Sequence, residues 1–447
     1  MPRILVRAHK NPFMVASAEK TLSDNLIGQN TGNLVFSQAV YRLLSTTDNT
    51  LSTGGIGSGT VAEELSEKYD HVVVPLANAF RPKYVERLDT MSAIFEKLTI
   101  PVTVLGVGAQ ASLEGEQRNA DLLEPAVRRF VRAVLRRSGS IGVRGEFTQQ
   151  YLKSLGFGDS DVEVIGCPSM FMYGPDLKIS KKVESLGPDS PIALNISPYV
   201  KEMGPISLRH AERYPNLVYM AQNLSSLELL LEGHYPMGKK SPMRTSGVPV
   251  TLEHPLIRQD RVRFFLDPST WFEHLAQYDF SFGTRIHGNI AALLAGTPAL
   301  LLAHDSRTLE LAEYHHIPHR LISDLPRDVD AADLYAAADW EPLNEAHHDN
   351  WVRFSGFLAR HQLTHVYQPG QSAEMFDATL AATEFPPPVR TLMGATPEEL
   401  YAMKRELAEA HHSRKEALKA MTSRAVPQNV TDYVRLAARR MVRRVRR

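Results

Sequence analysis

The sequence predicts an α/β protein with two domains that face each other across a cleft, followed by a helical extension. Short apolar runs alternate with segments of helical periodicity, which is typical of parallel strands joined by helices. The runs are apolar throughout, as expected of strands that helices cover on both faces. A polar stretch with three prolines at 174–191 interrupts the alternation, and 447 residues are too many for one ordinary core.

The first predicted domain, residues 1–185, contains repeated strand–helix–strand units. Its strand candidates are 50–55, 71–80, 101–110, 140–145 and 161–171, and its helix candidates are 84–98, 122–137 and 146–157. Parallel βαβ units of this kind predict a Rossmann-like domain.

The second predicted domain, residues 186–330, repeats the pattern. Its strand candidates are 191–197, 216–224, 262–267, 278–285 and 297–305, and its helix candidates are 268–278, 286–296 and 306–316. Pro268 fits a first helical turn, Gly296 a helix end, and Ser306 is the expected N-cap of the third helix. Open α/β sheets bind ligands at the carboxyl ends of their strands, so two Rossmann-like domains in succession predict a ligand cleft between them.

The third predicted region, residues 331–447, is helical. Residues 331–362 favour one or two helices, 385–389 (FPPPV) a rigid spacer, and 396–422 a charged helix with Thr396 and Glu399 as a capping box. The last segment, 431–447, has seven arginines and one acid, with apolar residues at roughly helical spacing. A basic amphipathic helix fits an anionic membrane surface, and an acidic partner or a solvated chain end explains it equally well.

Composition narrows the class of protein. A formal net charge of zero argues against a general nucleic-acid binder. The single cysteine, Cys167, forms no internal disulfide and is expected to be a buried small side chain in a protein of a reducing compartment. Neither a signal peptide nor a membrane span is predicted. We therefore expect a cytoplasmic protein, peripheral at the inner face of the cell membrane if the basic tail binds lipid.

The first candidate site lies where strand 278–285 meets helix 286–296. Arg285 and His287 stand at the end of the strand and the start of the helix, where free N–H groups and the helix dipole favour an anion. Gly283 and Gly288 flank them and are expected to let the backbone approach a ligand closely. A phosphate or a carboxylate would suit this arrangement.

The next strand end carries a second cluster, formed by His304, Asp305, Ser306 and Arg307. Either cluster alone is more often structural, because an arginine at a helix start is commonly just a surface charge. Two such clusters at neighbouring strand ends favour a binding site, since ligands gather there.

At these residues the chain resembles polysaccharide pyruvyltransferases. The resemblance rests on the G-x-R-x-H step at 283–287, the helix rich in Ala and Leu, the G-x-P turn at 296–298, the apolar strand and the basic residue beyond it. Four other segments agree in order: IGQNTGNLVFSQAVYRLL (27–44), STGGIGSG (52–59), SIGVRGEFTQQYLKSLG (140–156) and VEVIGCPSMF (162–171). The resemblance covers roughly residues 25–320.

The resemblance implies a GT-B-like fold and a reaction. The enolpyruvyl unit of phosphoenolpyruvate would be transferred onto two hydroxyls of one sugar, giving a cyclic pyruvate ketal in a cell-surface polysaccharide or glycolipid. It assigns donor binding and catalysis to Arg144, His287 and Arg307, the last of which is Lys in relatives. Arg307 keeps the charge and adds a bidentate fork. Gly145 replaces the usual acid, so that Glu146 is the nearest carboxylate, and Cys167-Pro168 replaces the usual Asp-Pro.

The chemistry agrees with these residue types. Phosphoenolpyruvate carries a phosphate and a carboxylate, which Arg144, Arg285 and Arg307 can neutralise. His287 is expected to transfer a proton, either to the enol methylene carbon or from the attacking hydroxyl. Further contacts are assigned to Gly283, Gly288 and Ser306 for the donor, and to Asn30, Asn33, Gly54 and Gly55 for the acceptor or cleft. No cofactor is required, and no Cys/His spacing suggests a metal.

The expected partners are phosphoenolpyruvate and a glycan or lipid-linked oligosaccharide acceptor, with no nucleic acid; a homo-oligomer is left open. Two alternatives also remain open. A nucleotide-sugar glycosyltransferase of the same shape would need a carboxylate for a ribose, and Glu310 or Glu313 could serve. A catalytically inactive scaffold for envelope assembly would use the helical C-terminus for docking. His315 and His316 are expected on a helix surface or at its C-terminal end, and the tryptophans in packing.

Overall fold

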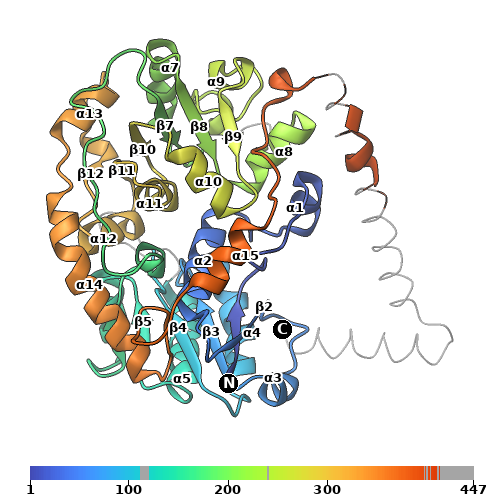
Figure 1. The fold of residues 1–447 in the computed structure, drawn as a ribbon, viewed down its shortest axis with the longest axis vertical. Helices are drawn as coiled ribbons and strands as arrows, with labels where there is room; N and C mark the ends of the chain where they lie inside the picture. Colours follow the sequence, from blue (N-terminus) through green and yellow to red (C-terminus); the bar gives the residue numbers. More distant parts are fainter. Residues whose placement is uncertain are drawn as a thin grey trace.

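The computed structural model describes residues 1–110, 120–238 and 241–396, together with residues 398, 401, 402, 404–409 and 412. Most of the predicted helix 396–422 and the whole basic tail therefore lie outside the described residues. Within the described part, two parallel sheets form two halves of the molecule, one above the other in Figure 1. This is the α/β, GT-B-like arrangement that the sequence predicts.

The first half is built on a four-stranded parallel sheet with the order β2-β1-β3-β4. A two-stranded parallel pair, β5-β6, continues from β4 through a bridge between Val107 and Val143. The strands are β1 (Arg3–Arg7), β2 (Thr50–Gly54), β3 (His71–Pro75), β4 (Val102–Leu105), β5 (Ile141–Val143) and β6 (Val162–Val164). The helices are α1 (Ala18–Asp24), α2 (Gly32–Leu44), α3 (Ala62–Lys68), α4 (Val85–Phe95), α5 (Ala120–Leu135) and α6 (Glu146–Ser154), with 3₁₀ turns η1 (Pro82–Tyr84) and η2 (Pro168–Phe171).

The second half is a six-stranded parallel sheet with the order β12-β11-β10-β7-β8-β9. The strands are β7 (Ile192–Asn195), β8 (Leu217–Ala221), β9 (Val262–Phe264), β10 (Phe280–Gly283), β11 (Ala299–Ala303) and β12 (His319–Leu321). The helices are α7 (Met203–Arg213), α8 (Leu224–Glu232), α9 (Pro255–Arg258), α10 (Pro268–Leu275), α11 (Ile286–Leu294) and α12 (Ser306–Tyr314), with η3 (Pro242–Arg244) and η4 (Ile322–Asp324).

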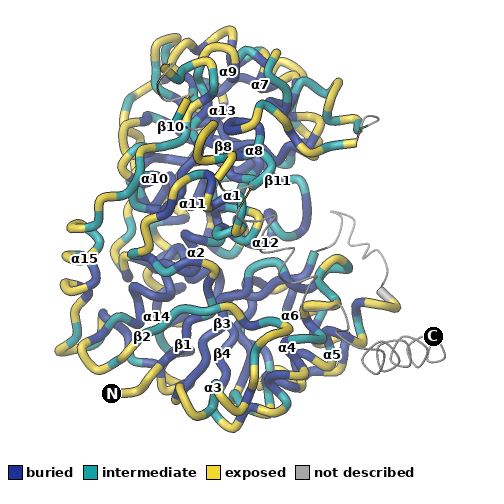
Figure 2. The backbone as a smooth tube through the Cα atoms, turned by 90° about the vertical axis from the view of Figure 1, so that its right-hand side faces the viewer, coloured by how far each residue is buried: buried dark blue, intermediate teal, exposed yellow. Residues whose placement is uncertain are grey.

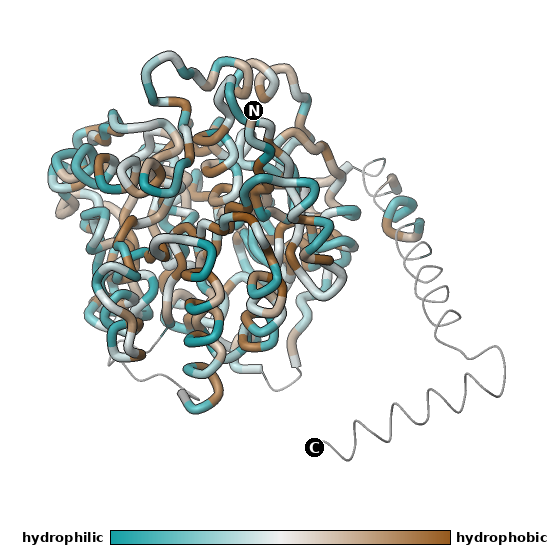
Figure 3. Tube along the Cα trace, turned by 90° about the horizontal axis from the view of Figure 1, so that it is seen from below, coloured by the Kyte–Doolittle hydropathy of each residue, from teal (hydrophilic) through white to brown (hydrophobic). Residues whose placement is uncertain are grey.

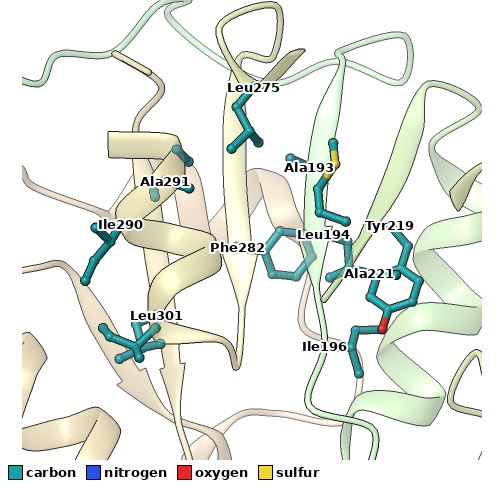
Figure 4. Packing of buried hydrophobic residues seen from close by; sticks show 14 of the residues in the cluster. Ala193, Leu194, Ile196, Tyr219, Ala221, Leu275, Phe282, Ile290, Ala291 and Leu301 are labelled. Carbon is teal, nitrogen blue, oxygen red and sulfur yellow. The ribbon is translucent and has the colours of Figure 1, made fainter. Parts of the chain in front are cut away.

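Helices cover the strands because the strands are apolar on both faces. Leu194 of β7, Phe282 of β10 and Leu301 of β11 are fully buried among neighbouring aliphatic and aromatic side chains (Figure 4). Buried segments run through the interior of both halves, and exposed ones form the outer turns (Figure 2). In the view of Figure 3, hydrophobic and hydrophilic residues alternate along the outer helices, as expected of amphipathic helices on a sheet.

After the second sheet the chain returns to the first half. It continues through α13 (Ala331–Ala337), α14 (Glu341–Arg360), α15 (Glu374–Ala381) and η5 (Leu392–Gly394). Phe354 of α14 stacks on Phe171 with 4.8 Å between ring centroids, in a cluster that includes Ile4 and Val6 of β1. α14 and α15 therefore close the core of the first half, whereas α13 packs in the second half, and Val389 beyond α15 pairs with Phe264 of β9.

The structure corrects two expectations about secondary structure. Strands β1 and β12 were not expected from the sequence. Both are short and carry charged side chains, which weakens the apolar signal. Asp305, and not Ser306, is the N-cap of α12, because its carboxylate accepts a hydrogen bond from Thr308 N at 2.9 Å. The proposed domain boundaries at 185 and 330 remain predictions. No helix among the described residues is long and apolar enough to cross a membrane.

We predict that Phe354→Ala destabilises the first half by about 3–5 kcal/mol, because it removes a buried ring and leaves a cavity. The matched control is Val352→Ala, two residues away on α14, where the side chain is 54% exposed and the expected change is within about 0.5 kcal/mol. Urea unfolding of both variants measures the difference. Equal midpoints for the two variants would show that α14 does not close this core.

Candidate functional site

A cleft of about 1260 Å³ lies between the carboxyl ends of the two sheets. It is lined by segments that follow β1, β3 and β5 in the first half and β7, β8, β10 and β11 in the second. Basic side chains outnumber carboxylates in its walls by seven to two: Arg7, Arg81, Lys83, Arg87, Arg144, Arg285 and Arg307 against Glu202 and Asp305. Such an excess of positive charge favours an anionic ligand.

Arg285 is fixed by the end of the neighbouring strand. Its backbone N donates to Asn195 Oδ1 at 2.8 Å, its Nε donates to Ile196 O at 3.3 Å, and its guanidinium also donates to Asn223 Oδ1. The guanidinium lies 5.9 Å from the centre of the Tyr199 ring. Burial lowers the pKa of Arg285, but an arginine remains charged near neutral pH.

The glycines around Arg285 are packed against neighbouring strand ends. A Cβ at Gly283, whose φ is +143°, would lie 1.8 Å from Asn195 O, and a Cβ at Gly288 would lie 2.4 Å from Gln222 Nε2. Neither glycine lines the cleft. Both are needed because the backbone packs closely on the ends of β7 and β8, and their assignment to the donor stays a prediction.

Arg307 is positioned by the N-cap of its own helix. Its Nη2 lies 3.2 Å from Asp305 Oδ2, and Asp305 also caps α12. Burial lowers the pKa of Arg307, but Asp305 and Tyr199 outweigh it and raise that pKa overall. His304 comes directly before Asp305, and its Nε2 lies 3.4 Å from the Tyr199 hydroxyl oxygen. Ser306, predicted to bind the donor, does not line the cleft.

Arg144 reaches the cleft from the first half, just after β5. A Cβ at Gly108 would lie 1.8 Å from its Nε, so that only glycine leaves room for this side chain. Its Nε is buried without a hydrogen-bond partner within the described part of the chain. Burial is the main reason that its pKa falls to about 10, and Arg307 lowers the pKa further while Glu310 raises it. Arg144 therefore remains charged, with donor capacity available to a ligand.

The acid beside Arg144 is Glu310, which the sequence suggested only as a ribose ligand under the glycosyltransferase alternative. Glu310 accepts hydrogen bonds from Thr148 N at 2.7 Å and Thr148 Oγ1 at 3.0 Å, so it joins α12 to α6 across the two halves. A Cβ at Gly145 would lie 2.3 Å from Glu310 Cγ, which explains glycine at that position. Glu146 is exposed and outside the cleft.

His287 lies among the three arginines. Its Nε2 is 3.8 Å from Cys167 Sγ, and its ring meets Phe36 edge-on with 6.0 Å between centroids. Burial lowers its pKa to about 3, and Arg144, Arg307 and Arg285 contribute to that shift in this order. His287 is therefore neutral near pH 7. Cys167 is buried as predicted, and burial raises its pKa, so it is a thiol there. We call Arg144, Arg285, Arg307 and His287 the His287 cluster.

The predicted acceptor residues are partly at the cleft. Asn30 and Asn33 line it. Asn30 Nδ2 donates to Asn223 Oδ1 at 3.2 Å, and Asn33 Nδ2 donates to Gly28 O at 2.9 Å, so both also hold their loop in place. Gly54 belongs to β2 and does not line the cleft, whereas Gly55 borders an adjoining pocket of about 350 Å³.

The sequence did not indicate the basic side chains of the first half. One of them, Arg7, is the last residue of β1, and the others, Arg81, Lys83 and Arg87, follow β3. We call these four residues the first-sheet cations. The available signal was a basic residue just after each of two apolar runs, RILVR and HVVVPLANAFRPK. His315 was expected on a helix surface or at the C-terminal end of the helix. It is the C-cap of α12, as the second alternative has it, but it is buried, and its Nε2 accepts from Cys167 N at 2.8 Å. No group of three or more potential metal ligands occurs within the described ranges.

We predict that the imidazole of His287 does not titrate between about pH 8 and pH 5, and that Arg307→Met raises its pKa by removing a neighbouring positive charge. Since the pKa of His287 is lower in the folded state than in the unfolded state, its contribution to stability is complete above about pH 6.5 and is lost as the pH falls toward 3. NMR of histidine-labelled protein measures the titration, with His287→Gln for assignment.

The control for this titration is Arg129→Met, because Arg129 pairs with Glu96 on the surface and has no effect on the pKa of His287. A wild-type His287 that titrates near pH 6.5 would contradict the cluster described above.

The chain is similar to one protein-family model and to several solved structures. The polysaccharide pyruvyl transferase family model matches residues 30–306. The S. aureus MnaA–UDP co-structure is 13% identical, covers 83% of this chain and 99% of its own, and has a TM-score of 0.42. The Methanocaldococcus jannaschii UDP-GlcNAc 2-epimerase in complex with UDP-GlcNAc and UDP is 12% identical, covers 80% of this chain and 99% of its own, and has a TM-score of 0.44. The search of curated proteins returned no match.

The family match extends over more than half of the chain and includes Arg144, Arg285 and His287, whereas Arg307 lies one residue beyond its end. The chain belongs to the polysaccharide pyruvyl transferase family.

Proposed function

We propose that the protein transfers the pyruvyl unit of phosphoenolpyruvate to two hydroxyls of a glycan sugar, forming a cyclic pyruvate ketal and releasing phosphate. The proposal rests on one observation above all: three arginines surround a neutral histidine at the meeting point of the two sheets. Family membership agrees with it. The reaction would take place in the cytoplasm, on a glycan or lipid-linked precursor of a cell-surface polymer.

The His287 cluster has the charge that the donor requires. Phosphoenolpyruvate presents a phosphate and a carboxylate on a three-carbon unit, and Arg144, Arg285 and Arg307 supply three cations around one point. Arg144 has an unused donor, and Arg307 is held in a fixed direction by Asp305. Planar guanidinium groups bind phosphate and carboxylate through paired N–H donors, so they also orient the donor.

The reaction needs a balanced movement of protons. A proton adds to the methylene carbon of the donor, and the first sugar hydroxyl attacks the adjacent carbon and loses its proton. The second hydroxyl then attacks the same carbon, the C–O bond to phosphate breaks, and the departing phosphate takes up the second proton. Atoms and charge balance without a further reactant. A neutral His287 suits the role of proton acceptor for an attacking hydroxyl.

The arginines also stabilise the leaving group. Charge builds up on the phosphate oxygens as the C–O bond breaks, and fixed cations in a partly buried cleft stabilise that charge more strongly than water does. Binding of the donor anion would in turn raise the pKa of His287, because it offsets the positive charges that now lower it. His287 would therefore hold a proton more tightly once the donor is bound.

The glycosyltransferase alternative loses support from the geometry of two residues. Glu310 is buried in its hydrogen bonds to Thr148, and Glu313 is exposed; neither lines the cleft. Neither carboxylate is therefore placed to bind a ribose. The scaffold alternative gives no role to the excess of positive charge in the cleft. That excess lowers the stability of the folded protein, because like charges repel each other.

We predict that phosphoenolpyruvate at 100 times its Kd adds about 2.7 kcal/mol to the free energy of unfolding, and that Arg307→Met abolishes this effect. Thermal unfolding with and without the ligand measures it, with release of inorganic phosphate in the presence of a glycan acceptor as the second readout. His287→Gln should retain most of the binding but lose at least about a hundredfold in rate, since it removes only the proton acceptor.

Arg129→Met, on the surface of α5, is the matched control and should respond to phosphoenolpyruvate like the wild type. UDP and GDP are tested in parallel. Stabilisation by a nucleotide with no response to phosphoenolpyruvate would contradict the pyruvyl donor, and the family would then describe the fold of this chain but not its reaction.

A further inference from the structure

The first-sheet cations occupy a second switch point in the fold. In the first sheet, β2 lies on one side of β1, and β3 and β4 lie on the other. The chain therefore places β2 on one side of β1 and then β3 on the other side. At such a point the carboxyl ends of β1 and β3 leave a crevice, which is where α/β proteins bind ligands. Arg7 ends β1, whereas Arg81, Lys83 and Arg87 follow β3 in η1 and the first turn of α4.

These cations have no carboxylate partner within the described ranges. Arg7 donates to Pro75 O at 3.4 Å and to the Tyr84 hydroxyl at 3.2 Å, and the guanidinium of Arg81 lies 5.7 Å from the centre of the Tyr84 ring. The Nε atoms of both arginines are buried without a hydrogen-bond acceptor. By contrast, several arginines elsewhere pair with acids: Arg3 with Asp70, Arg42 with Asp377 and Arg129 with Glu96.

A glycine-rich loop faces the same cations. Residues 55–60 line a pocket of about 350 Å³ together with Arg7, Ala8, His9 and Arg87. A Cβ at Gly55, Gly57 or Gly59 would meet nothing within 4 Å, so the backbone borders open space. Among the described residues, the N–H groups of Ile56, Ser58 and Gly59 have no hydrogen-bond acceptor, whereas Gly57 N donates to Thr60 Oγ1 at 3.0 Å.

We propose that the glycine-rich loop and the first-sheet cations form a second anion subsite, which binds the diphosphate group of a sugar-diphosphate acceptor. Free backbone N–H groups beside several guanidinium groups are the donors that a diphosphate requires. This inference rests on the proposed function, because the acceptor is defined by the transfer that the His287 cluster performs. It assigns a chemical class, a sugar diphosphate, to the acceptor.

The subsite and the His287 cluster are parts of one cleft. Arg7 and Arg87 line both the main cleft and the smaller pocket. Arg81 is close enough to Arg307 for the charge of Arg307 to lower the pKa of Arg81, although burial is the larger cause. A sugar attached to a diphosphate in the smaller pocket therefore extends toward the donor. Two sources carry this chemistry, a nucleoside diphosphate and a polyprenyl diphosphate.

We expect inorganic pyrophosphate to bind the wild-type full-length protein in the presence of saturating phosphoenolpyruvate, as measured by isothermal titration calorimetry. Arg87→Gln should weaken pyrophosphate binding by about tenfold or more, which is the loss expected for one charge-assisted contact, and leave the affinity for phosphoenolpyruvate unchanged. Arg87 is exposed, so its replacement does not endanger folding. Arg87→Lys should restore part of the binding, and Arg129→Gln is the control that should match the wild type.

The opposite pattern overturns the subsite. If pyrophosphate competes with phosphoenolpyruvate and its binding is lost in Arg307→Met but retained in Arg87→Gln, it occupies the donor site only. Absence of pyrophosphate binding also overturns the proposal. If pyrophosphate binds through Arg87 while phosphoenolpyruvate does not bind at all, the proposed function fails and the subsite stands.

The same calorimetry with UDP and with farnesyl diphosphate distinguishes the two sources of the diphosphate. Binding of UDP alone, with the Arg87 dependence, identifies a nucleotide-linked acceptor. Binding of farnesyl diphosphate alone identifies a lipid-linked acceptor. Binding of both shows that the subsite recognises the diphosphate itself, and binding of neither contradicts the proposal.

Discussion

The hydrogen bonds between Glu310 and Thr148 fix the two walls of the cleft relative to each other. Glu310 belongs to α12 of the second half, and Thr148 to α6 of the first, and both are buried where the halves meet. Arg144 precedes α6 and Arg307 lies in the first turn of α12, so these bonds fix the direction from which each arginine enters the cleft. A buried carboxylate with two donors is worth more than an exposed ion pair, because removing either partner leaves an unsatisfied polar group. The arrangement of positive charge around His287 depends on this contact.

The cleft couples the attraction of an anion to the protonation state of His287. Burial keeps His287 neutral, and the surrounding guanidinium groups add to this effect. In the proposed reaction, the charge that attracts the donor would therefore also help to prepare the proton acceptor. Such coupling requires partial burial, since water would screen the arginines from the imidazole. The loop around Asn30, the end of β7 and helix α2 provide this burial from three directions.

Much of the architecture could be predicted from sequence, because parallel strands buried on both faces produce unbroken apolar runs. The end strands β1 and β12 were missed for the converse reason, since charged residues interrupt them. Arg285, His287 and Arg307 stood out because they follow strong strands. The packing of Gly283 and Gly288 on the ends of β7 and β8 could not be predicted, since a glycine signals a close approach but not the identity of the approaching group. Glu310 was misassigned because its partner, Thr148, lies far away in the sequence, and only the fold brings them together.

The return of α14 to the first half has a mechanical consequence. Beyond α15 the chain leaves the first half again, since Val389 pairs with Phe264 of β9 and Arg390 pairs with Asp260 in the second half. After β6 the described chain therefore passes between the halves three times: in residues 165–191, between α13 and α14, and between α15 and Val389. Each passage is a covalent tether between the halves. A large displacement of one half against the other would have to deform all three tethers, so the two walls of the cleft are held close together by the course of the chain itself.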